Sequence, residues 1–128
     1  MPSPPKYVLQ GSFDVPIETW AAAKEEIRVV LIETARKRAM IPYSELVGLI
    51  KSVNFKAFDQ RLFANLGQIS VEEHQAGRPL LSVLVVHKTG DMQPGDGFFE
   101  LAEPLDRDTS DIDKAWIAEV RMVFQHWN

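Results

Sequence analysis

GRPLLSVLVVHKTGDMQPGDGFFE, residues 77–100, is the stretch that decides the fold. It contains the longest apolar run of the chain, then a segment rich in glycine, proline and aspartate, then a second apolar start. The run at residues 80–86 is β-branched and too short for a typical buried helix, so it predicts a buried strand. The turn residues that follow predict a tip, and residues 98–101 predict a returning strand or a helical turn. The rest of the chain is expected to pack on this ribbon.

Two helices are predicted on the N-terminal side, separated by a short extended segment. Apolar residues recur every three or four positions in residues 17–39, which is typical of a long amphipathic helix. Pro42 favours extended backbone at residues 41–43 because proline disfavours helix in the residue before it. Ser44 is a suitable N-cap for a short second helix that continues to Ile50.

Three more helices are predicted from patterns and end signals. A third helix covers residues 55–66 and stops at Gly67, with its phenylalanines and leucines buried. The S-x-x-E spacing that starts at Ser70 predicts a separate short helix, which ends at Gly77. The last helix covers residues 111–127 and has an aromatic stripe. The side chains expected to be buried by the third helix are Phe55, Phe58, Leu62, Phe63 and Leu66.

Composition predicts one soluble domain over residues 1–128, with residues 1–6 disordered. The 128 residues are enough for a core, and 45% apolar with 25% charged residues is ordinary for a globular protein. No cysteine is present, which excludes disulfides, thiolate zinc sites and thiol catalysis. The start MPSPPK is neither a signal peptide nor a membrane span, so a cytoplasmic protein that does not enter membranes is expected.

The net charge of −4 is unevenly distributed. Residues 20–39 hold five basic and three acidic groups, whereas residues 91–128 hold nine acidic groups against three basic ones. A uniformly basic nucleic-acid-binding protein would look different. The pattern allows a basic contact surface in the first half and an acidic one at the C-terminus.

The order of the predicted elements resembles winged-helix domains. These have a helix, a short strand, two helices and a two-stranded wing, here followed by an added C-terminal helix. The fold class is therefore expected to be α+β and mostly α. The YSEL entry at residues 43–46 also resembles the DNA-binding half of alkyltransferase-like proteins, but without a cysteine no alkyl transfer is implied.

A closer resemblance is to a group of small bacterial proteins that share short motifs. They have LGxIS, GRPLLS, PGxGFFELA and a terminal tryptophan, which stand here at residues 66–70, 77–82, 94–102 and 127. The resemblance covers roughly residues 17–127. It implies a common fold and brings no activity with it.

A nucleic-acid site is predicted on the polar face of the third helix. In a helix-turn-helix the second helix enters the major groove, where Arg reads guanine and Asn or Gln reads adenine. Basic groups near the end of the first helix could hold phosphates, although cations there also suit the helix C-terminus. The alternative is that the third helix simply exposes a solvated face. The residues in question are Lys56, Gln60, Arg61 and Asn65, with Arg36, Lys37, Arg38, Lys88 and Thr89 as further contacts.

The tip at residues 87–97 is a second candidate for contact with nucleic acid. Lys88, Thr89 and Gln93 suit backbone contacts, whereas Asp91 and Asp96 would repel phosphate. A metal site formed by His87 with these two aspartates has no recognisable ligand spacing, and glycine and proline are explained by the turn itself. No metal or cofactor is expected.

Catalysis is not expected, and a protein partner is the alternative function. The three histidines share no motif with a nucleophile or a carboxylate, so the chain is predicted to be non-enzymatic. Trp116, Phe124 and Trp127 either close the core against Trp20 or form part of a partner or homodimer surface. The main hypothesis is a small module that binds double-stranded DNA or acts in regulation; the alternative is a protein-interaction module or homodimer that uses the aromatic, acidic C-terminal third.

Overall fold

The computed structural model describes residues 15–56, 59–86, 107 and 110–127, and within them the fold is α+β and mostly α. This confirms the expected α+β, mostly α class. The expected tip and returning strand, and residues 1–6, lie outside the described residues. The elements are α2 (Ile17–Arg36), β1 (Ile41–Pro42), α3 (Tyr43–Leu49), α4 (Gln60–Gln75), the 3-10 helix η1 (Leu81–Leu84), β2 (Val85–Val86) and α6 (Ile112–His126).

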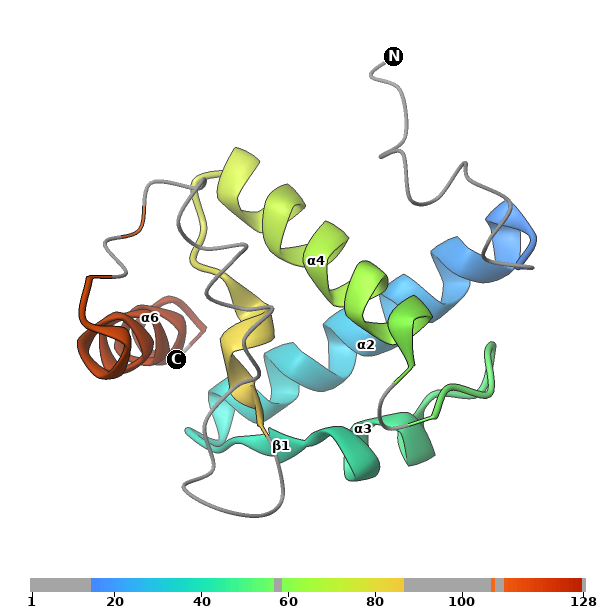
Figure 1. Cartoon of the computed structure of the whole chain (residues 1–128), viewed down its shortest axis with the longest axis horizontal. Helices are drawn as coiled ribbons and strands as arrows, with labels where there is room; N and C mark the ends of the chain where they lie inside the picture. The colour runs from blue at the N-terminus through green and yellow to red at the C-terminus, as the bar shows by residue number, and fades with distance from the viewer. Residues whose placement is uncertain (1–14, 57–58, 87–106, 108–109, 128) are drawn as a thin grey trace.

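The short helix η1 is the centre of the arrangement. It packs against α2, α4 and α6, and Figure 1 shows η1 between α6 and the crossing of α2 with α4. Every residue of η1 is buried, and three of its four side chains are fully inaccessible. The three helices therefore bury their apolar faces against one short segment rather than against a broad sheet.

The prediction of a plain strand over residues 80–86 is wrong in its first half. Residues Leu81–Leu84 form a 3-10 turn, and only Val85 and Val86 are extended. A strand would place successive side chains on two opposite faces, whereas η1 must fill the space between helices that surround it. The strand pairs with β1 in parallel, with Ile41 opposite Val85 and Pro42 opposite Val86.

The third helix and the capping-box helix are one helix, α4. It begins one residue after Asp59, whose side chain accepts from the Arg61 backbone N–H at 2.9 Å. Gly67 does not stop it, because the buried face continues from Leu62 to beyond it. Ser70 caps nothing: it is buried mid-helix, and its hydroxyl donates to the Ser82 hydroxyl at 2.7 Å.

Two side chains of the expected third helix lie differently from the prediction. Phe55 is buried but precedes α4, and Phe63 lies in α4 with 40% of its surface exposed. The Phe63 ring meets Tyr43 edge to face at a centroid distance of 5.6 Å. Tyr43 itself opens α3 directly after Pro42, so Ser44 lies inside the helix and is not its N-cap.

Helices α2 and α4 end in the same type of turn. In α4 the Gly77 N–H donates to the His74 carbonyl at 3.0 Å and the Arg78 N–H to the Glu73 carbonyl at 2.8 Å, with Gly77 at a φ of 77°. This is a Schellman turn, in which the residue after the cap is left-handed and is usually glycine.

In α2 the corresponding left-handed residue is an arginine. The Arg38 N–H donates to the Ala35 carbonyl at 2.9 Å, the Ala39 N–H donates to the Thr34 carbonyl at 3.1 Å, and Arg38 has a φ of 53°. An arginine therefore occupies a backbone position that favours glycine.

The last helix forms where the sequence predicts it. The Asp111 side chain caps it by accepting from the Lys114 backbone N–H at 3.2 Å. None of the helices in the described ranges is both long and apolar enough to cross a membrane.

Candidate functional site

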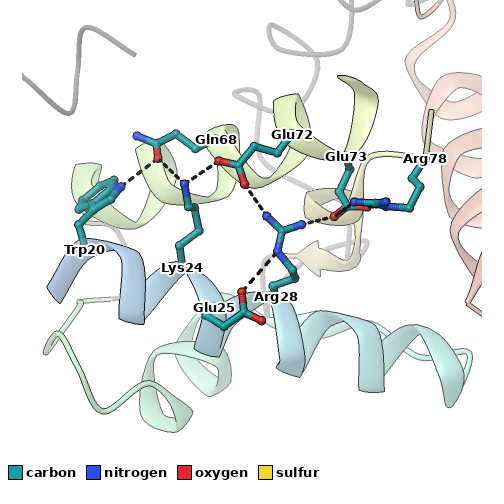
Figure 2. A network of polar contacts seen from close by, with 8 residues as sticks. All are labelled: Trp20, Lys24, Glu25, Arg28, Gln68, Glu72, Glu73 and Arg78. Carbon is teal, nitrogen blue, oxygen red and sulfur yellow. Dashed lines mark hydrogen bonds and ion pairs between the residues drawn. The ribbon is translucent and has the colours of Figure 1, made fainter. Parts of the chain in front are cut away.

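A polar network joins α2 to α4 (Figure 2). Trp20, Lys24 and Arg28 recur every four residues on α2, so they project from one stripe toward α4. The Trp20 indole N–H donates to Gln68 Oε1 at 2.9 Å, and Lys24 Nζ donates to Glu72 Oε2 at 2.6 Å and to Gln68 at 3.3 Å. The stripe therefore aligns the two helices by directional contacts.

Glu73 is the hub at one end of this network. Its side chain is 1% exposed, and both carboxylate oxygens accept from guanidinium groups of Arg28 and Arg78. Arg28 also donates to Glu72 Oε1 at 2.6 Å. The hydrogen bond with Glu73 raises the pKa of Arg78. A buried carboxylate needs such partners, so the two arginines are explained by the burial of Glu73. The cluster leaves no carboxylate or guanidinium free to act as an acid or a base.

A second buried carboxylate anchors α6, and we call its contacts the α6 clasp: Glu119, Arg107, His74 and the Leu80 N–H. Glu119 accepts from Leu80 N–H at 2.7 Å and from Arg107 Nε at 2.7 Å. Arg107 Nη1 lies 3.2 Å from His74 Nδ1. Since a guanidinium only donates, this contact requires the His74 nitrogen to accept. The clasp connects the segment before α6 to the end of α4.

The predicted nucleic-acid residues of the third helix do not lie on one exposed face. Gln60 is exposed at the start of α4, and Lys56 is exposed ahead of it. Asn65 was expected on the polar face, but it is 0% exposed, and its amide has no hydrogen-bond partner among the described residues. Asn65 is buried because it lies three residues after Leu62 and four before Ile69, on the buried face of α4.

Arg61 is held by its own helix cap. Its Nη2 lies 2.7 Å from Asp59 Oδ2 and 3.3 Å from the Asn54 carbonyl, and its guanidinium lies 5.6 Å from the Phe55 ring centroid. The hydrogen bond from the Arg61 side chain lowers the pKa of Asp59 from 3.8 to about 2. The Arg61 guanidinium is thus bound to the Asp59 carboxylate and is not free to contact a DNA base.

The predicted partner residues of α6 face the molecule. Trp116, Phe124 and Trp127 are partly buried against the core. Trp20, expected to meet them, instead donates from its indole N–H to Gln68 of α4. Trp20 lies in the first turn of α2, and the start of α2 is on the opposite side of Figure 1 from α6. Lys88 and Thr89 lie outside the described residues, as do His87, Asp91 and Asp96, for which no metal site was expected.

Three consecutive cations, Arg36, Lys37 and Arg38, stand at the end of α2, and we call them the basic turn. All three side chains are exposed, and none forms an ion pair with another described residue. By contrast, Arg28, Arg61, Arg78 and Arg107 each contact a carboxylate. In Figure 1 this end of α2 lies at lower left, whereas residues 50–56 lie at the right, so the basic turn and Lys56 are far apart.

Sequence reasoning missed the buried carboxylates Glu73 and Glu119. The available signals were the i, i+4 spacing of Lys24 and Arg28 on an otherwise apolar helix face, and a glutamate within the apolar stripe of α6. Among the residues that the structure describes, no three metal-ligating side chains come together. Comparisons with protein-family models, with curated proteins and with solved structures gave no match.

Proposed function

We propose that the protein is a small, non-enzymatic, winged-helix-like module that binds nucleic acid, and that the basic turn holds the phosphate backbone. The order of α2, β1, α3, α4 and the strand after it supports the winged-helix-like part of the proposal. The partner chemistry is a chain of phosphodiesters, because it offers several anionic groups to several closely spaced cations.

The observation behind this proposal is the contrast between paired and unpaired arginines. Arg36 and Arg38 are exposed and, like Arg121, form no ion pair with another described residue, whereas four other arginines of the chain each contact a carboxylate. Arg38 also occupies a left-handed backbone position, which costs an arginine about 1 kcal/mol relative to glycine. Strained positions of this kind are concentrated at functional sites, which favours a role in binding over a role in stability.

Base reading by α4 is a smaller part of the proposal than backbone contact. Gln60 is exposed on α4 and Lys56 precedes it, whereas Arg61 is tied to Asp59 and Asn65 is buried. We therefore propose binding with little sequence preference, dominated by electrostatic attraction and strongly weakened by salt.

The test is fluorescence anisotropy of labelled duplex and single-stranded DNA over a range of salt concentrations. A variant with Arg36→Gln, Lys37→Gln and Arg38→Gln is compared with the natural chain. If all three cations contact phosphates, the slope of log K against log salt for duplex DNA becomes shallower by about 2.7.

A matched variant controls for net charge. Lys51→Gln, Lys114→Gln and Arg121→Gln also remove three exposed cations, but at other places on the surface. It should retain the natural slope. Absence of DNA binding at low salt, or an equal loss in both triple variants, would contradict the role of the basic turn.

A further inference from the structure

The face of α6 that packs on the core makes favourable apolar contacts but also buries polar groups that lack a hydrogen-bond partner among the described residues. Val120 and Val123 enter the core, and Trp116 and Trp127 pack beside it. However, the indole N–H groups of both tryptophans are buried and have no hydrogen-bond partner among the described residues. A buried donor without an acceptor loses its bond to water and gains nothing in return. Docking α6 therefore has a cost that undocking would remove.

Among the contacts between described residues, the clasp is what joins α6 to the turn after α4 by hydrogen bonds and an ion pair. Glu119 is 2% exposed and accepts from both the Leu80 N–H and the Arg107 guanidinium. Helix α6 packs on η1 and on α2, and in Figure 1 it lies at the edge of the molecule. By contrast, α2 and α4 are joined by the separate network in Figure 2, to which α6 contributes no residue. Loss of the clasp therefore weakens α6 and leaves the α2–α4 pair intact.

We infer that α6 is a releasable helix, held by the clasp, which leaves the α2–α4–η1 core as a unit before the rest unfolds. This goes beyond nucleic-acid binding and uses none of the basic turn. Release of α6 would also change the surroundings of its aromatic stripe. Docked, Trp116, Phe124 and Trp127 face the core; released, they become an exposed amphipathic helix face. Groups of residues that open together in this way are common in folded proteins.

Native-state hydrogen exchange of the full chain tests the inference. Slowly exchanging amides of α6 should exchange at least tenfold faster than those of α2 and α4. Glu119→Gln should speed exchange in α6 by a further tenfold or more and leave α2 and α4 at their natural rates. Arg121→Gln, an exposed change on the same helix, is the control and should alter neither.

Thiol labelling provides a second measurement that does not depend on Glu119. The chain has no cysteine, so a single introduced thiol is the only reactive one. Val123→Cys on α6 should be labelled at least tenfold faster than Ile27→Cys on α2, although both positions are 0% exposed. Equal rates at the two positions, equal exchange of all helices, or no response of α6 to Glu119→Gln would overturn the inference.

Discussion

Asp59 has two roles in one side chain. It caps α4 through the Arg61 backbone N–H, and it pairs with the Arg61 guanidinium. Asparagine keeps the capping oxygen but lacks the charge, so Asp59→Asn separates the two roles. We expect this variant to lose about 1–2 kcal/mol of unfolding free energy at pH 7, measured by urea denaturation. Asp59→Ala should lose about 1 kcal/mol more, because the cap is also removed.

The pH dependence of this contribution has a definite sign. Folding lowers the Asp59 pKa from 3.8 to about 2, so the ionised form is favoured in the folded state. The stabilisation is complete above the unfolded value and disappears as the pH falls through the folded value. The difference in stability between the natural chain and Asp59→Asn should therefore be constant from pH 7 to about 5 and shrink as the pH falls from about 4 toward 2. A constant difference down to pH 3 would contradict the ion pair.

The two left-handed residues should respond to substitution with opposite signs. Gly77→Ala adds a Cβ that meets no atom within 4 Å, so its cost comes from the φ of 77° alone. We expect a loss of about 1 kcal/mol. Arg38→Gly relieves the corresponding strain, which by itself should stabilise the fold by about 0.5–1 kcal/mol. The greater freedom of glycine in the unfolded chain offsets part of this gain. Thermal denaturation of both variants tests this, and a shared sign would contradict it.

At the scale of elements, the contact between α2 and α4 tests how burial decides the value of an ion pair. Glu73 is buried between two arginines, whereas its neighbour Glu72 has 42% of its side chain exposed. Glu73→Gln leaves two guanidinium groups poorly paired and should lose about 2–4 kcal/mol of unfolding free energy. Glu72→Gln should lose less than about 1 kcal/mol. Chemical denaturation compares them, and similar losses would mean that burial is not the deciding variable.

The elements that could be predicted were those set by local pattern. The long helix α2 and the C-terminal helix follow from periodicity, and the short α3 follows the extended segment at Pro42 as expected, although Ser44 is not its N-cap. The errors arose where tertiary contacts override such signals. Ser70 has the spacing of an N-cap, but its hydroxyl bonds Ser82 of another segment, and α4 continues through it.

Much of the candidate site could not be predicted for the same reason. Asn65 has the residue type of a base-reading side chain, but it lies on the buried face of α4, one turn from Leu62 and Ile69. Arg28, a partner of Glu73, is 45 residues away from it in sequence, and Arg107, the partner of Glu119, is 12 residues away. Periodicity within one helix therefore cannot identify these pairs. The basic turn can be seen in the sequence because it is local, but only the structure shows that it forms no ion pair with the rest of the described chain.

For the whole molecule, charge and apolar surface are organised on different principles. Charged groups join elements in pairs, α2 with α4 and α6 with the turn after α4, whereas apolar packing converges on η1. A change in one ionic cluster should therefore affect one contact, and a change in η1 should affect all three surrounding helices.

Leu84 provides the most direct test of this convergence. It is fully buried in η1, which packs against α2, α4 and α6. Leu84→Ala removes the side chain where the neighbouring helices cannot easily close the space, and we expect a loss of about 3–5 kcal/mol. The control is Met122→Ala, a large apolar residue of α6 that is 41% exposed, which should lose less than about 1 kcal/mol. Because η1 packs against α2, α4 and α6, Leu84→Ala should also speed hydrogen exchange in all three helices together, in contrast to Glu119→Gln. An effect of Leu84→Ala confined to α6 would show that the core is not organised around η1.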